Sequence, residues 1–376
     1  MPLGEGVKAR EDPVITSAEI DKLRCIRAPH ETVLSLYAGV PLDPAGLREL
    51  RAHACDLIGE AASRGPGLVS ADDERVASEN VSAQARHNLG HTLGVFVCGE
   101  LGLREVVALP GGLAERAVLA VRPHVRPLLA AMQRFPDHRI VIIDRRHVWL
   151  LAVTGARIET LGRVADAGVS SRRFGGWYGL ETYAVSRRVA ELDRHHYRDA
   201  AAILDMAVRD SGQRPLVIGG HADSISHLLA SLSRTARNGY AGCFAADPHA
   251  LTPDRARDLA AAVVARHIEQ RERQLVEQTV TPTCGARTAI GIHACLAAVN
   301  ADEAGLLLIP DQGMTPGYYC ERCEVLSLSS DECCDWGAAS RAVPDLLEEM
   351  ALRTLNAGGE VVSTAELPCG VAARLR

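Results

Sequence analysis

The residues best suited to binding a polyanion lie in a glycine-rich stretch at 171–179 and in the polar segment that follows it. Three glycines within five positions allow close backbone approach and leave no side chains to keep a partner away. Arginines suit phosphate contacts, and aromatic side chains suit stacking on unpaired bases. The pattern predicts contact with structured RNA, and an ordinary glycine-rich turn before a solvated helix is the competing interpretation. The candidates are Arg172, Arg173, Gly175, Gly176, Trp177 and Tyr178 in the loop, and Arg187, Arg188, Arg194, His195 and His196 in the helix.

A second group of candidate residues consists of cysteines near the end of the chain. Cys320 and Cys323 are separated by two residues, which is the spacing of half a zinc knuckle. Cys333 and Cys334 are adjacent, which constrains tetrahedral geometry around a metal. The four thiols therefore have two interpretations: one structural zinc site, or reduced thiols or a labile disulfide. No other cofactor is predicted.

Two further patterns are weaker evidence for a binding site. His87 and His91 are four residues apart, as two ligands on one helical face would be, but Gly90 between them disfavours a helix. Gly219 and Gly220 follow a strand-like run, as in some nucleotide-binding turns. The chain contains neither GxGxxG nor GxxxxGK[ST], so nucleotide binding at this turn is not favoured.

The composition limits the class of protein. Of the 376 residues, 47% are hydrophobic and 23% are charged, as expected for a soluble globular chain. No apolar run reaches the roughly 20 residues that a membrane span needs, and the charged start lacks the apolar region of a signal peptide. The formal net charge of −6 argues against a general nucleic-acid binder. We therefore predict a cytoplasmic protein without membrane or DNA partners, whose RNA contact is a local basic patch.

The elements that must position these residues predict an α/β protein of three domains, at 1–126, 127–280 and 281–376. The first is an α/β domain whose initial 30 or so residues look loosely ordered. The middle domain is predicted to be a mixed β-sheet with long helices. Its expected strands are 140–143, 148–153, 156–161, 215–221 and 240–245, and its expected helices are 180–210, 223–231 and 252–279.

The third domain is predicted to be a small α/β/α layer with a cysteine-bearing insertion. Ala289, Ile292, Leu296 and Val299 are spaced for one helical face, and residues 306–309 form a buried strand. A second helix at 346–355 ends at a glycine pair, and the next strand follows at 360–362.

Taken in order, these features resemble the archaeo-eukaryotic class-1 peptide release factor and Pelota family, most closely its bacterial branch with the Balon-like ribosome-associated proteins. The resemblance rests on Gly175-Gly176-Trp177, the Arg-His-His-Tyr run at 194–197, and the strand with its glycine pair at 216–220. The third domain adds the cysteine-bearing insertion and a Gly-Gly-Glu-Val segment at 358–361. The match covers roughly residues 135–376; the first domain matches only in position and size.

The resemblance implies a factor that binds the ribosomal A site in rescue or hibernation. The loop would lie near the peptidyl-transferase region, and the basic helix would bind rRNA or tRNA backbone. The third domain would bind a protein partner, such as the translational GTPase elongation factor Tu. Decoding motifs are not identifiable in residues 1–126, so no stop-codon reading is expected.

Peptide release in this family is linked to Gly-Gly-Gln, whereas Trp177 follows the glycines here. Members without that glutamine include Pelota and Balon-type factors, so we expect a binder and not an enzyme. Two alternatives remain open. One is a peptidyl-tRNA hydrolase that positions water with another group, such as His195 or an arginine. The other is a non-ribosomal interaction protein that kept the fold.

Overall fold

The structure is a computed structural model in which the chain forms two compact units. The terminal unit consists of residues 1–134 and 271–376, and the middle unit consists of residues 135–270. The α/β fold class predicted from the sequence is confirmed. The three-domain boundaries stay a prediction, and the middle unit lies inside the predicted middle domain 127–280. The described residues are 17–28, 32–64, 69–155, 157–165, 195–205, 214–281, 287–330 and 340–376.

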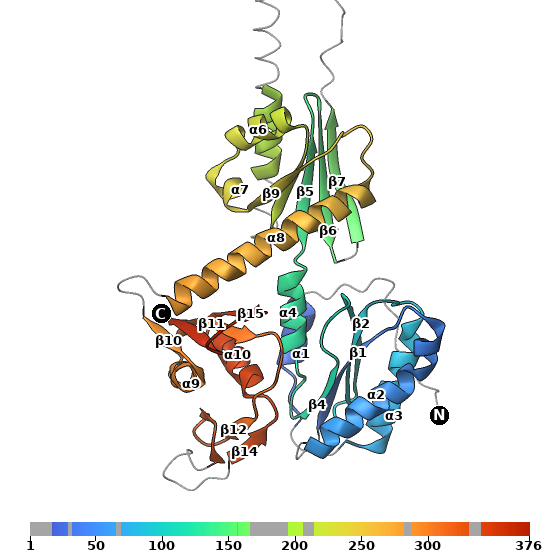
Figure 1. The fold of residues 1–376 in the computed structure, drawn as a ribbon, viewed down its shortest axis with the longest axis vertical. Coiled ribbons are helices and arrows are strands. Elements are labelled where there is room, and N and C mark those ends of the chain that lie inside the picture. Colours follow the sequence, from blue (N-terminus) through green and yellow to red (C-terminus); the bar gives the residue numbers. More distant parts are fainter. Residues whose placement is uncertain are drawn as a thin grey trace, which may run out of the picture. The chain divides into compact units, whose positions relative to one another are not determined.

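The first sheet of the terminal unit is antiparallel, with strand order β3-β2-β1-β4. Alternate side chains of β1 enter two different cores, as the two-residue period of a strand requires. Leu34 and Leu36 pack under α2 and α3, whereas Tyr37 packs with α1 and α4. The elements are α1 (Ser17–Arg24), β1 (Val33–Gly39), α2 (Pro44–Arg64), α3 (Ala71–Ala85), β2 (Thr92–Cys98), β3 (Leu103–Leu109), β4 (Arg116–Ala120) and α4 (Arg126–Arg134) (Figure 1).

Helix α1 corrects the expectation that the first 30 or so residues are loosely ordered. Its short sequence carries little helical periodicity, but Ile20 and Leu23 are buried against the sheet. Tertiary packing therefore stabilises a segment whose own propensity is weak.

The second sheet of the terminal unit forms the predicted α/β/α layer, with order β10-β16-β11-β15. Leu307 and Ile309 of β11 pack with α9 and α10, whereas Leu306 and Leu308 face Leu275 and other apolar residues of α8. The elements are β10 (Thr288–Ile290), α9 (Ile292–Asn300), β11 (Ala304–Pro310), α10 (Leu346–Asn356), β15 (Glu360–Thr364) and β16 (Ala372–Leu375). The insertion holds β12 (Gly317–Cys320), β13 (Leu326–Ser327) and β14 (Ser340–Val343).

The expected helical face that began at Ala289 was wrong at its first residue. Ala289 lies in β10 and pairs with Ala373 of β16. Gly291 separates it from α9 with a φ of 83°, a conformation that is costly for other residues. The glycine therefore ends the strand and lets the helix begin at Ile292.

A buried polar network in the terminal unit consists of His124, Arg126, Asp345 and Glu348. Asp345 Oδ2 lies 3.0 Å from His124 Nε2 and 3.0 Å from Arg126 Nη1. The Glu348 carboxylate accepts hydrogen bonds from the backbone N–H groups of Val125 (2.9 Å) and Arg126 (2.8 Å), where α4 begins. Burial alone would raise the pKa of Asp345, but the hydrogen bond from His124 and the Arg126 cation outweigh it and lower that pKa.

The middle unit contains a mixed five-stranded sheet with order β7-β6-β5-β8-β9, which confirms the sheet type predicted from the sequence. Strands β5, β6 and β7 form an antiparallel meander, whereas β5, β8 and β9 are parallel neighbours. The strands are β5 (His138–Ile143), β6 (His147–Thr154), β7 (Arg157–Ala165), β8 (Leu216–Gly220) and β9 (Tyr240–Ala245).

Helices cover both faces of this sheet (Figure 1). Val141 and Ile143 of β5 pack with helical residues 195–205 and with α6 (Ala222–Ser231). Ile140 and Ile142 pack against α8 (Pro253–Val280). The short α7 (Arg234–Asn238) precedes β9. Within the described residues, each helix is too short or too polar to cross a lipid bilayer.

Candidate functional site

The ends of three parallel strands meet at one edge of the middle sheet. Ile143 of β5 is in register with Gly220 of β8, which is in register with Ala245 of β9. Ligands of open α/β sheets bind outside the carboxyl ends of parallel strands, where loops carry functional side chains. The residues that follow these strands are therefore the first place to look for a site. We call this region the parallel-strand edge.

Asp144 follows β5 at the parallel-strand edge, and its carboxylate is held in place by the turn that it forms. Its Oδ1 accepts hydrogen bonds from the backbone N–H groups of Arg146 (2.6 Å) and His147 (2.7 Å). Its own N–H donates to the carbonyl of His147 at 3.1 Å, which closes the hairpin. Aspartate suits this position because its short side chain can bond the backbone two residues further on. The other oxygen, Oδ2, takes no part in these backbone bonds.

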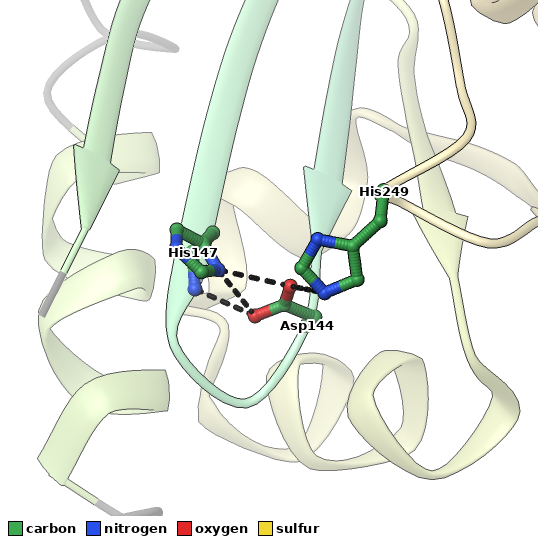
Figure 2. A group of neighbouring side chains, drawn as sticks. All are labelled: Asp144, His147 and His249. Carbon is green, nitrogen blue, oxygen red and sulfur yellow. Dashed lines mark hydrogen bonds and ion pairs between the residues drawn. The ribbon is translucent and has the colours of Figure 1, made fainter. Parts of the chain in front are cut away.

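Two imidazole rings approach Oδ2 from different elements (Figure 2). His147 Nδ1, at the start of β6, lies 3.0 Å away, and His249 Nε2, in the loop after β9, lies 3.4 Å away. The ring centroids are 5.7 Å apart and the rings are nearly perpendicular, at 83°. Burial alone would raise the pKa of Asp144, but the two backbone hydrogen bonds and the His147 ring outweigh it and lower that pKa. The carboxylate is therefore ionised and available as a ligand at neutral pH.

The chain leaves and re-enters the described structure at this same edge, on either side of residues 166–194. Ala165, the last residue of β7, pairs with His147 of β6. His196 Nε2 lies 3.1 Å from the carbonyl oxygen of Asp144. Both ends of the segment that carries the predicted RNA-binding loop are thus anchored beside Asp144.

Of the predicted RNA-binding residues, the structure describes only the last two. His195 is exposed, in agreement with a surface role. His196 is 5% exposed, contacts the Asp144 carbonyl, and lies edge-on to the buried Tyr197 ring. This burial favours a role in the core, because a buried ring does not reach a phosphate backbone. The predicted residues outside the described chain are Arg172, Arg173, Gly175, Gly176, Trp177, Tyr178, Arg187, Arg188 and Arg194.

Comparison with known proteins addresses the same region. Residues 123–272 match the sequence model of bacterial archaeo-eukaryotic release factor family 10. The resemblance inferred from the sequence is thereby confirmed for the middle of the chain. We call the matching segment the release-factor-type domain. No curated protein matches the chain.

Solved structures of release factor and Pelota proteins also align with the chain. An archaeal translation termination factor, aRF1, is 14% identical, covers 96% of both chains and has a TM-score of 0.26. A ribosome-bound archaeal Pelota is 14% identical, covers 96% of this chain and 94% of its own, and has a TM-score of 0.41. Dom34 of S. cerevisiae is 11% identical, covers 76% of this chain and 79% of its own, and has a TM-score of 0.40. With TM-scores this low, the alignments themselves do not bear on function.

The cysteines predicted to hold zinc are only partly described. Cys320, the last residue of β12, is buried, and Cys323 in the following turn is exposed. Two backbone hydrogen bonds close this turn: Glu324 N–H donates to the Cys320 carbonyl at 2.9 Å, and Cys320 N–H donates to the Val325 carbonyl at 3.0 Å. Cys333 and Cys334 lie outside the described residues. The structural zinc site therefore stays a prediction.

Sequence reasoning missed the Asp144, His147 and His249 cluster in the release-factor-type domain. The expected strands 140–143 and 148–153 left Asp144 and His147 in the connection between them, and His249 was not singled out at all. The available signal was an Asp and a His three residues apart around a hairpin turn. The third member is brought to them by the order of the parallel strands, which the sequence does not display.

Proposed function

We propose that this protein is a ribosome-associated translation factor of the release factor and Pelota type, which occupies the ribosomal A site during rescue or hibernation. The observation that carries the proposal is the family match of residues 123–272. The described anchors of the loop segment support it, because β7 and the helical residues 195–205 hold the two ends of that segment at one edge of the sheet. In this proposal the loop and its basic helix contact rRNA and the tRNA in the P site.

The proposal also covers the terminal unit. The terminal unit's α/β/α layer binds a protein partner, and a translational GTPase such as elongation factor Tu is the class we favour. Reading of a stop codon by residues 1–126 is not part of the proposal. The S. cerevisiae Dom34 structure is described as a factor that interacts with Hbs1, and the archaeal Pelota structure as ribosome-bound with ABCE1. Partner capture from cells and cryo-electron microscopy of the bound ribosome test these assignments.

Ribosome binding is expected to depend on the basic residues of the loop segment. Arginine contacts with phosphate release counterions, which steepens the salt dependence of affinity by roughly 0.7–0.9 in log–log slope per phosphate. Replacing Arg187, Arg188 and Arg194 together by glutamate should therefore weaken binding to vacant bacterial ribosomes and flatten this slope by about two. Co-sedimentation over a series of salt concentrations measures both quantities.

A matched variant controls for the change of overall charge. Arg234, Arg255 and Arg266 are exposed in the same domain but lie on other helices, and their replacement by glutamate alters the formal charge equally. This control should keep the affinity and slope of the wild type. Equal losses in the two triple variants would show that only net charge matters, and an absence of ribosome binding by the wild type would remove the proposed function.

Peptide release is expected to be absent. The glutamine that the family uses for release is replaced by Trp177 after Gly175-Gly176, so the loop lacks its water-positioning group. Incubation with ribosomes that carry peptidyl-tRNA should leave the ester intact, with a true release factor as positive control. Strong release that disappears in Gly175→Ala would identify the protein as a peptidyl-tRNA hydrolase.

A further inference from the structure

We propose that Asp144, His147 and His249 form a binding site for a divalent transition metal ion, with zinc as the ion that fits best. Each residue offers one ligand atom, and these atoms lie within 4.8 Å of one another. Two imidazole nitrogens and one carboxylate oxygen are a ligand set that zinc accepts in proteins, usually with a further position left for water.

The spacing of the ligand atoms agrees with this ion. Zinc binds nitrogen and carboxylate oxygen at about 2.0–2.2 Å, so two ligands of a tetrahedral site lie about 3.4 Å apart. Asp144 Oδ2 is 3.0 Å from His147 Nδ1 and 3.4 Å from His249 Nε2. Two edges of a tetrahedral face thus already have nearly the right length, and the third, between the two nitrogens, is at most 4.8 Å.

The carboxylate is preorganised for this role. Its Oδ1 is held by the N–H groups of Arg146 and His147. Its Oδ2 lies within 3.4 Å of a nitrogen of each ring (Figure 2). Hydrogen-bonded outer partners of this kind fix the orientation of metal ligands and raise their affinity. The Asp144 side chain is 11% exposed, whereas His147 is 37% and His249 69% exposed. The fourth position of the ion is therefore open to solvent.

The place of the site connects it with the loop segment of the domain. His147 pairs with Ala165, and the Asp144 carbonyl contacts His196, so the ion would sit between the two anchors of residues 166–194. It would also link the β5–β6 turn to the loop after β9, because its ligands come from both. A bound ion should therefore stabilise the edge of the sheet from which the loop segment extends.

The test uses the full chain, freed of metal under reducing conditions and titrated with Co²⁺ and then Zn²⁺. Cobalt bound by thiolates shows sulfur charge-transfer absorption, whereas cobalt bound by imidazole and carboxylate does not, which separates this site from the cysteines. We expect one cobalt equivalent without sulfur bands. His249→Ala should weaken that binding at least about 100-fold, since loss of an outer-shell partner alone costs 10–100-fold.

Three variants make the result specific. His249 is largely exposed, so its replacement should not disturb folding. His53→Ala serves as control, because His53 also faces a single carboxylate, Glu115 Oε2 at 3.0 Å, without a second imidazole, and it should leave binding unchanged. Asp144→Asn should lower affinity while keeping an acceptor for the backbone N–H groups. The proposal is overturned if all bound cobalt shows sulfur bands, or if wild type and His249→Ala bind equally.

Discussion

Arg126→Met is expected to destabilise the terminal unit by about 3–5 kcal/mol. The Arg126 side chain is 2% exposed, its Nη1 lies 3.0 Å from Asp345 Oδ2, and its Nη2 donates to the Gly313 carbonyl. Methionine fills similar space without the charge, so the ionised Asp345 carboxylate would remain buried and lose its cation. Removing one partner of a buried pair costs this much because the charge that remains is uncompensated.

Arg134→Met is the matched control. Arg134 is the last residue of the same helix and also pairs with an aspartate, Asp311, but its side chain is 47% exposed. Exposed pairs contribute about 0–1 kcal/mol, so this variant should stay close to the wild type. Hydrogen exchange of β1 and β11 amides during urea unfolding reports the terminal unit separately from the middle unit. Similar losses in both variants would mean that burial of the network adds little.

The buried polar network also explains one limit of the sequence reasoning. A domain boundary was predicted between residues 126 and 127. In the structure helix α4 (Arg126–Arg134) spans this boundary, and residues at or just before its start belong to a buried charged cluster of the terminal unit. Its partners, Asp345 and Glu348, come from the other end of the chain. No local sequence pattern predicts a pairing between charged residues that are so far apart in the sequence.

The strands of the release-factor-type domain could be predicted because their apolar runs are strong and their turns are short. The expected strands 140–143, 148–153 and 156–161 correspond to β5, β6 and β7, with ends that differ by a few residues. Apolar side chains on both faces of β5 pack against helices on both sides of the sheet. Local periodicity is sufficient to find these strands, although the residues that bury them come from distant parts of the chain.

The candidate metal site could not be predicted in the same way. Asp144 and His147 lie in one turn. His249 is near them because β9 lies parallel to β5, two strands away, so that both strands end at the same edge of the sheet. Sheet order depends on long-range packing and leaves no periodic trace in the sequence. The RNA-binding residues were chosen by type and by their place in the predicted loop and helix. These criteria do not distinguish a buried polar residue such as His196 from an exposed one.

The second large expected effect concerns the glycine pair at the end of β8. Gly220→Ala should destabilise the middle unit by about 2–6 kcal/mol. Gly220 has a φ of 150°, and a Cβ atom there would lie 2.3 Å from the carbonyl oxygen of Ile143. That oxygen belongs to the backbone of β5, so no side-chain rotation can relieve the contact. Backbone strain and overpacking each cost about 1–3 kcal/mol, and the variant incurs both.

Gly162→Ala is the control for this change. Gly162 lies in β7 of the same sheet, and an added Cβ would meet nothing within 4 Å. Its unfolding free energy should stay within about 0.5 kcal/mol of the wild type, as for most uncrowded surface changes. Urea unfolding followed by hydrogen exchange of β5 and β8 amides measures the middle unit in both variants.

Comparing the stabilities of Gly220→Ala and Gly162→Ala tests why two glycines lie at this edge of the sheet. Gly219 would also clash, since its Cβ would lie 2.4 Å from Phe244 Cζ, so the structure assigns the pair to close packing between β5, β8 and β9. A large loss in Gly220→Ala beside an unchanged Gly162→Ala agrees with this assignment. If Gly220→Ala is instead as stable as the wild type, the strands can move apart without cost. The glycines would then have to be explained by a ligand that approaches the backbone, which is the interpretation that the missing phosphate-binding motif had disfavoured.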